Sequence, residues 1–538
     1  MNNLLKYILI FIIISFTLKG YGQLYHSFNG YIQKTIAADI NNPENNVTTT
    51  LQPFYYSDIA NIIDSCETDM PNDWLKYPIS AVFDSSFRKL YGLRFDVRPM
   101  IMAEAQNLDK YLNYGGGLWI ASDYKNKLAI EFSIFYQTLP GEKYASFVQE
   151  SVIDKSFRVM PYYADSLGLF QDFHITYRPF KYLTAEAGYG RHFVGDGYRS
   201  MLLSAETFNY PYFKTELNFW NIKYLFMVSR IKDYSFTPSL FGTGYSWSST
   251  INCNVTHHLQ WQVSKNFSIG LFESVITDAM PDIYYFNPAI FLRPVEFSLG
   301  SSENVLMGLN TKITIAKNYH FYGQFVLDDI NISKFKSDIK HFLNPDEEGL
   351  EYGFFGNKIA LQAGFKTYNF AGVKNLNWFV EWNYARPYTY SHNTSSRNYA
   401  SSFRPLAHPA GANFKEWVFG LDYIYKRFEC ELRFFYLRTG LDTENTHYGQ
   451  DIYKPTMDAD HGHNIPVNTY YNTTLQGELN TITAADLQFY YNINPSRGLK
   501  IGLGLSSSTH NVEDTYKQRV FQWRVGISSY MYKNYTGF

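Results

Sequence analysis

The chain has 538 residues, 18% of them charged, and a formal net charge of −2 at pH 7. This balance gives no electrostatic basis for nucleic-acid binding, and no nucleic-acid partner is expected. Cys66, Cys253 and Cys430 lie too far apart to form a disulfide framework, so we interpret them as small buried or lipid-facing residues rather than as a redox site.

Residues 1–22 have the order of a secretory signal peptide. Lys6 is followed by an apolar run over 7–18 and then by the small residues Gly20 and Gly22. The run is shorter than the ~20 residues that a membrane helix needs, which favours cleavage after Gly22 over the alternative of an uncleaved anchor. We therefore expect an exported protein.

Residues 23–91 form the next predicted unit, and they fit a strand pattern badly. Short helices are expected over 58–64 and over 74–90, the second of them after Pro71. We predict a small periplasmic helical segment, or a plug, beneath a third unit that spans 92–538.

The third unit is predicted to be a β-barrel in the outer membrane. Aromatic residues make up 19% of the chain, which suits the aromatic girdles of such barrels. A tyrosine-rich soluble sandwich would explain the aromatics but not the alternation. In the last strand Phe521, Trp523 and Val525 alternate with Gln522 and Arg524, as lipid-facing and lumen-facing residues should. Other charged residues expected to face a hydrated lumen are Glu381, Glu431, Arg433 and Lys500.

Short turns alternate with long polar loops along this unit. The loops are expected at 140–169, 234–252, 278–300, 331–352, 387–413 and 439–483. Strands are expected to begin near residues 94, 113, 127, 170, 181, 212, 222, 255, 267, 303, 319, 357, 376, 415, 428, 484, 498 and 517. The fold class is therefore all-β: a transmembrane antiparallel β-barrel of about 18 strands, within a range of 16 to 20, with short turns in the periplasm and long loops outside.

Enzyme motifs are missing from the sequence. It has no G-x-S-x-G, H-E-x-x-H, C-x-x-C or G-x-G-x-x-G pattern, so we expect neither an enzyme nor a cofactor. An outer-membrane hydrolase with an unlisted Ser/His arrangement stays an alternative. The one cluster with metal-like ligands is Asp458, Asp460, His461 and His463, for which a solvated acidic loop is the preferred interpretation. Residues 195–200 could cradle an anion, but their Gly-Asp-Gly chemistry favours a plain loop turn.

The loop over 383–416 combines tyrosines with hydrogen-bonding side chains, a combination that suits sugars. An ordered, self-packed loop beside an aromatic girdle explains the same residues equally well. Candidates for glycan contact or loop ordering are Glu381, Arg386, His392, His408, Asn413 and Glu416.

Several stretches resemble a known family, the Wzi-type capsule-assembly barrels, and especially its branch of gliding motility proteins called RemB from gliding Bacteroidetes. The matching stretches are 189–204, 273–275, 286–288, 322–329, 374–376 and 386–416. The resemblance implies an 18-stranded outer-membrane barrel with a periplasmic helical part. It also implies either a surface lectin that holds exported polysaccharide or a role in gliding that is linked to the type 9 secretion pathway, and it supplies no catalytic residues.

Three functions follow as hypotheses. The first is a non-enzymatic outer-membrane protein for cell-surface polysaccharide or for gliding, with outer-membrane lipid, a capsular or surface polysaccharide and gliding or type 9 secretion components as its partners. The second is a porin-like channel for small solutes, because 18 strands enclose a water-wide lumen unless loops or the N-terminal segment fill it. The third is the hydrolase already mentioned.

Overall fold

The computed structural model describes residues 30–68, 86–90, 93–107, 112–125, 127–138, 167–238, 245–278, 283–287, 303–402, 404–442, 446–454, 456, 467–495, 498–513 and 515–529. The predicted signal peptide and the Asp458 to His463 cluster lie outside these ranges. In the described part of the chain, no helix has the length and apolar character needed to span a bilayer.

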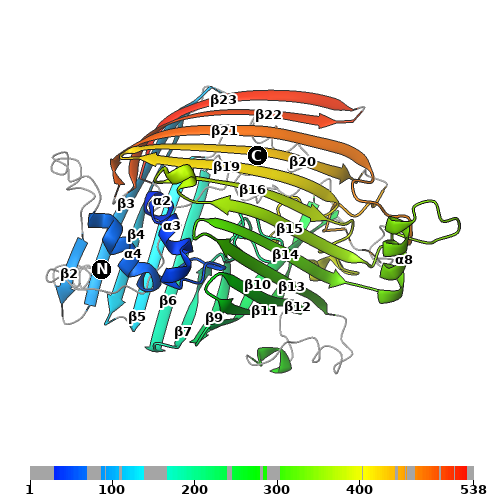
Figure 1. The fold of residues 1–538 in the computed structure, drawn as a ribbon, viewed down its shortest axis with the longest axis horizontal. Coiled ribbons are helices and arrows are strands. Elements are labelled where there is room, and N and C mark those ends of the chain that lie inside the picture. Colours follow the sequence, from blue (N-terminus) through cyan, green and yellow to red (C-terminus); the bar gives the residue numbers. More distant parts are fainter. Residues whose placement is uncertain are drawn as a thin grey trace.

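Eighteen antiparallel strands form a closed barrel (Figure 1). They are β3 (Leu93–Gln106), β4 (Leu112–Tyr124), β5 (Leu128–Thr138), β6 (Leu167–Phe180), β7 (Leu183–Gly190), β9 (Tyr210–Phe219), β10 (Ile222–Pro238), β11 (Tyr245–Ser264), β12 (Phe267–Asp278), β13 (Asn304–Ile315), β14 (Tyr319–Asp329), β15 (Lys358–Thr367), β16 (Leu376–Ala385), β19 (Phe414–Tyr425), β20 (Phe428–Leu441), β21 (Glu478–Asn494), β22 (Leu499–Val512) and β23 (Tyr516–Ser528). The last strand closes on the first through the pairs Arg524↔Gln106 to Ser528↔Met102.

Each strand pairs with its neighbours in the chain, so the order around the barrel follows the sequence. Short connections such as 181–182, 220–221, 265–266 and 426–427 gather at one end, here called the short-turn end, where β3 also begins. The connections at the other end, the long-loop end, include 191–209, 330–357, 386–413 and 442–477. The predicted strand count and the predicted alternation of turns and loops are confirmed.

Two predicted strand starts were wrong by more than three residues. The β10–β11 hairpin continues to the pair Pro238↔Tyr245, so most of the loop expected over 234–252 is strand. The polar composition of this stretch suggested a loop, but the backbone ladder between β10 and β11 makes it strand. For the same reason β21 begins at Glu478 rather than near 484.

The N-terminal segment lies within the short-turn end of the barrel (Figure 1). Its elements are α2 (Gly30–Thr35), α3 (Ala37–Asn41), η1 (Pro43–Asn45), β1 (Leu51–Gln52) and α4 (Tyr56–Thr68). Ile36, Ile40, Ile59 and Ile63 pack together against Ile424 of the barrel wall. The helix expected over 58–64 lies within α4.

The second expected helix, over 74–90, was wrong at its end. Residues 86–90 form the strand β2 (Ser86–Leu90), which pairs with β3, and 69–85 lie outside the described residues.

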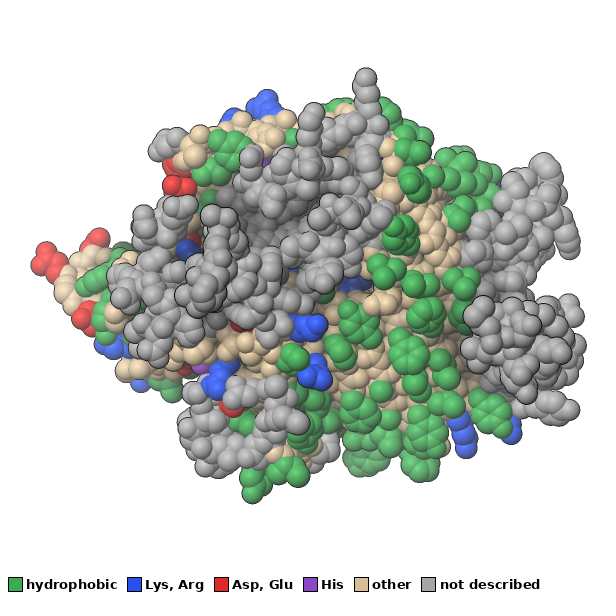
Figure 2. Space-filling model, turned by 180° about the vertical axis from the view of Figure 1, so that it is seen from behind, with side chains coloured by type: hydrophobic (Ala, Val, Ile, Leu, Met, Phe, Trp, Pro, Cys, Tyr) green, Lys and Arg blue, Asp and Glu red, His purple; other side chains and the backbone are tan. Residues whose placement is uncertain are grey.

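The outer face of the wall carries the apolar half of each strand. In β23, Phe521, Trp523 and Val525 are exposed, whereas Gln522 and Arg524 between them are partly covered. Figure 2 shows hydrophobic side chains spread over a broad area of one side of the wall. The period-two pattern thus places apolar groups outward and polar groups inward, as predicted.

Candidate functional site

Three segments meet inside the barrel and form what we call the loop core: residues 49–52, the loop 191–209 and the loop 386–413. β1 pairs with β8 (Phe193–Val194) through Leu51↔Val194 and Gln52↔Phe193, so the N-terminal segment and the loop 191–209 share a two-stranded sheet. The loop 386–413 contributes the small hairpin β17 (Ala400–Ser401) and β18 (Arg404–Pro405). The loop core therefore joins segments from both ends of the barrel.

Asp196 lies at the junction between the N-terminal segment and the loop 191–209. Thr49 and Thr50 both donate hydrogen bonds to its carboxylate. The ammonium groups of Lys312 and Lys366, from the inner faces of β13 and β15, lie 3.4 and 3.9 Å from its Oδ1 atom. Burial alone would raise the pKa of Asp196, but the two ammonium groups and the threonine hydroxyls hold this pKa well below its ordinary value.

Glu381 of β16 binds the backbone of the same loop. Its carboxylate accepts hydrogen bonds from the amides of Tyr198 and Arg199 at 2.7 and 3.0 Å, and from the Tyr322 hydroxyl at 2.9 Å. A Cβ at Gly197 would collide with the Glu381 carboxylate, which explains why a glycine stands there. Residues 195–200 are a loop, as expected, but a buried one whose polar groups the strands satisfy.

Arg199 links the loop 191–209 to the barrel wall. Its guanidinium pairs with Glu206 and lies 3.3 Å from Oε1 of Glu416 on β19. Burial alone would lower the pKa of Arg199, but the two carboxylates raise this pKa further above its ordinary value. Asn383 donates a hydrogen bond to Glu416 at 3.0 Å and another to Glu381 at 2.9 Å, so both carboxylates belong to one network.

His408 completes this network from the loop 386–413. The Ala410 amide donates to its Nδ1 atom at 3.1 Å, so Nε2 carries the proton and donates to Glu416 at 2.7 Å. Burial lowers the pKa of His408 despite the adjacent Glu416, which favours a neutral ring. Because both ring nitrogens are engaged, the imidazole is not free to activate a serine.

Buried tyrosines pack the two loops against each other. The hydroxyls of Tyr390 and Tyr399 donate to the carbonyls of Met201 and Leu202 at 2.8 and 2.9 Å. The Ser204 amide donates to the Leu406 carbonyl at 2.7 Å. Since these side chains are fully buried, they order the loops rather than present a free surface.

The structure brings together three of the six predicted residues, Glu381, His408 and Glu416. Arg386 instead pairs with Asp338 at 2.9 Å. Asn413 bonds to the loop 442–477 through the Leu475 amide at 2.7 Å and the Gln476 carbonyl at 2.8 Å. The backbone of His392 bonds to Asn398 and Thr456.

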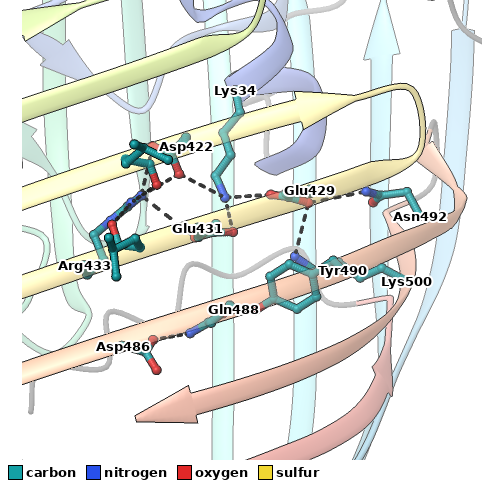
Figure 3. Close-up of polar contacts among 12 residues, drawn as sticks. Lys34, Asp422, Glu429, Glu431, Arg433, Asp486, Gln488, Tyr490, Asn492 and Lys500 are labelled. Atoms are coloured by element: carbon teal, nitrogen blue, oxygen red, sulfur yellow. Dashed lines mark hydrogen bonds and ion pairs between the residues drawn. The ribbon is translucent and has the colours of Figure 1, made fainter. Parts of the chain in front are cut away.

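A second ionic cluster holds the N-terminal segment to the wall (Figure 3). Lys34 of α2 pairs with Glu431 and, at 2.7 Å, with Glu429, both on β20. Arg433 pairs with Asp422 at 2.8 Å, and Lys500 lies 3.8 Å from Glu429. The expected lumenal charges therefore meet one another and the N-terminal segment.

Sequence reasoning missed Asp196, Arg199, Lys312 and Lys366 as members of the buried network. The polar residues at inward positions of the strands are the feature of the sequence that could have identified them. Lys312, Gln324, Gln362 and Lys366 are polar residues on the inward positions of three consecutive strands, and this density predicts a polar partner inside the barrel.

No protein-family model matches the chain, and no curated protein matches its sequence. Among solved structures, it is similar to Wzi, an outer-membrane protein involved in group 1 capsule assembly in Escherichia coli and a carbohydrate-binding β-barrel, with a TM-score of 0.54 and 10% identity over 94% of this chain and 99% of that chain. The chain has the fold of an outer-membrane β-barrel. The predicted fold class is confirmed, while membership of the gliding branch stays a prediction.

Two porins also match with lower TM-scores. The BenF-like porin from Pseudomonas fluorescens Pf-5 has a TM-score of 0.42 and 9% identity over 80% of this chain and 98% of that chain. OprD from Pseudomonas aeruginosa has a TM-score of 0.40 and 8% identity over 82% of this chain and 96% of that chain.

Within the described residues, no group of three or more His, Cys, Asp or Glu side chains is placed to hold a metal ion. The Asp458, Asp460, His461 and His463 cluster lies outside them, so that interpretation stays a prediction.

Proposed function

We propose that the protein is a non-enzymatic outer-membrane barrel that binds a polysaccharide at the cell surface. The observation that carries the proposal is the loop core, which crosses the barrel interior and bonds to its wall through buried charges. A barrel filled in this way offers a polymer its long-loop surface rather than a channel. The fold shared with Wzi, which is described as a carbohydrate-binding barrel, supports the same function.

The glycan would contact tyrosines at the long-loop end. Tyr471 is 59% exposed and meets Tyr352 edge to face at 5.2 Å. The Lys334 ammonium lies 4.7 Å from the centre of the Tyr470 ring. We call Tyr352, Tyr470 and Tyr471 the tyrosine platform. Aromatic faces beside a cation and backbone amides suit the apolar faces and hydroxyls of sugars.

The six predicted residues would order the loops beneath this platform. Asn413 fixes the base of the loop that carries Tyr470 and Tyr471, and Arg386 holds Asp338 beside Tyr352. Glu381, His408 and Glu416 hold the loop core. His392 bonds the loop 386–413 to Thr456.

Binding of the purified full-length barrel to extracted surface polysaccharide tests the proposal. We expect Tyr471→Ala to weaken binding by roughly 3- to 10-fold, the loss of one aromatic contact. Tyr182→Ala is the matched control, because Tyr182 is exposed in a turn at the short-turn end. Equal binding by both variants and the parent, or no binding by the parent, would contradict the proposal.

A porin-like channel is the second candidate, and planar-bilayer conductance separates it from the first. We expect no steady open channel from the parent protein. A steady conductance would instead favour the porin, because the loop core would then leave a continuous water path.

The biological setting of the barrel is either capsule assembly and attachment or gliding motility. Deleting the gene and measuring both capsule retention and colony spreading distinguishes the two. A strain that keeps both properties unchanged would contradict both settings.

A further inference from the structure

The helix α8 (Ile332–Leu343), in the loop 330–357, carries an exposed apolar face. Ile332, Ile339, Phe342 and Leu343 are 68%, 45%, 83% and 69% exposed. Their spacing of seven, three and one residues places them on one side of a helix. Four large apolar side chains on one face of a surface helix need a partner to cover them.

Asp338, on one flank of the apolar face, fixes α8 to the rim of the barrel. Asp338 accepts hydrogen bonds from the Gly353 amide at 2.6 Å and from Asn357 at 2.8 Å, and it pairs with Arg386. Arg386 follows Ala385, whose side chain packs into the buried interior, so alternation directs Arg386 to the outer side of the wall. The helix is therefore held at the outer circumference, beyond the ends of β14 and β15 (Figure 1).

Along the barrel axis, α8 lies at the height where the apolar outer face of the wall ends. Phe321 and Phe325 are exposed on the outer face of β14, which ends at Asp329. Only Ile330 and Asn331 separate that strand from the helix, a span of roughly 7 Å at strand geometry. The first turn of α8 thus begins where the lipid-facing belt of β14 ends.

The residues beside the apolar face of α8 also suit a position at the membrane surface. Lys336 and Lys340 lie beside it, and long lysine stems can cover apolar surface while their charges reach headgroups. His341 stacks on Tyr352 at 3.5 Å between ring centroids, so the tyrosine platform lies on the other side of the helix.

We propose that α8 is an interfacial helix whose apolar face enters the outer leaflet of the membrane. The occupant of this face is lipid: acyl chains meet Ile332, Ile339, Phe342 and Leu343, and anionic headgroups meet the lysines. The helix would hold the loop 330–357, and with it Tyr352, at a fixed height above the membrane. This inference depends on the barrel lying in a membrane and not on glycan binding.

Bimane labels at single cysteines test the proposal in the full-length protein, after Cys66, Cys253 and Cys430 are replaced by alanine. The test site is Phe342→Cys, and the matched control is Ser333→Cys on another side of the same helix. Both proteins are reconstituted in phosphatidylethanolamine and phosphatidylglycerol vesicles. Quenching is measured with a shallow spin-labelled phospholipid and with aqueous iodide.

We expect the lipid quencher to act at least about twofold more strongly at 342 than at 333, and iodide to show the reverse order. Equal quenching at the two sites would overturn the proposal. So would a label at 342 that iodide reaches in vesicles but not in isolated outer membranes, because a partner protein would then cover the face. Since no glycan is present, failure here leaves the proposed function untouched.

Discussion

The barrel wall and the loop core are stabilised in different ways. In the wall, each side chain has its environment set by its parity along the strand, as Phe521 and Gln522 show in β23. In the loop core, Asp196 and Arg199 follow no period, and buried partners from distant strands decide their environment. Stability in the wall is therefore spread over many equivalent residues, whereas in the loop core it is concentrated in a few charges.

This difference predicts unequal costs for single substitutions. When an outward wall residue is replaced by a smaller apolar one, only part of one side chain's contact with lipid is lost. A buried charge that loses its partner stays uncompensated in a low-dielectric interior, which costs about 3–5 kcal/mol. The following variants test whether the loop core behaves as such a concentrated network.

The largest effect is expected from Arg199→Met. It leaves Glu206 and Glu416 without their shared guanidinium, and we expect the loops 191–209 and 386–413 to open more easily by about 3–5 kcal/mol. Hydrogen exchange of these loops in the purified barrel measures the change. Lys265→Met is the matched control, because the Lys265–Glu44 pair is exposed to solvent and contributes little to stability.

A triple variant sharpens this test. Replacing Glu206 and Glu416 with glutamine in the Arg199→Met background removes the two carboxylates that have lost their partner. This should restore part of the protection of the two loops against hydrogen exchange. Unchanged exchange in Arg199→Met would show that the loops do not depend on this network.

The wall could be predicted from the sequence because its information is local. Alternation and turn chemistry located sixteen of the eighteen strand starts to within three residues. The β11 start was missed because Ser246, Ser248 and Ser249 are compatible with both a loop and a hairpin, and only pairing with β10 decides between them.

The loop core could be predicted only in part because its information is not local. Glu381 and Glu416 stood out as charges on strands beside a tyrosine-rich loop. Asp196 looked like an ordinary turn residue, since its partners Lys312 and Lys366 are more than a hundred residues away in the chain. No periodicity in one sequence connects such positions.

A smaller effect is expected from Lys34→Met at the junction of the N-terminal segment and the wall. Burial alone would lower the pKa of Lys34, but Glu431, Glu429 and Asp422 raise this pKa well above its ordinary value, so the ammonium stays charged. The Lys34 side chain is 22% exposed, so solvent screens its ion pairs with the wall. We expect the variant to weaken the attachment of the N-terminal segment to the wall by about 2 kcal/mol. Faster proteolysis within 30–68, with the strands still protected, would be the measured result. A proteolysis rate equal to that of Lys265→Met would place this cluster with the weak surface pairs.

The smallest effect concerns pH and the loop 386–413. Burial, with Lys358 and Arg397 nearby, lowers the pKa of His392 from its ordinary value of 6.5 to about 4. Between these values the unfolded loop binds more protons than the folded loop, so the stability that is present above pH 6.5 is lost as the pH falls toward 4. The loss should be on the order of 1–2 kcal/mol. Hydrogen exchange of 386–402 between pH 7 and pH 4.5, corrected for intrinsic rates, measures it.

The control for this prediction is His392→Gln, which cannot titrate. Carboxylates also titrate near pH 4.5, so the difference between the parent and this variant isolates the imidazole. The difference should grow as the pH falls, and exchange in the strands β21 to β23 should change equally in both proteins. If the parent and the variant have the same pH profile, His392 stays accessible to protons in the folded loop. The buried groups that stabilise the loop core would then not include His392.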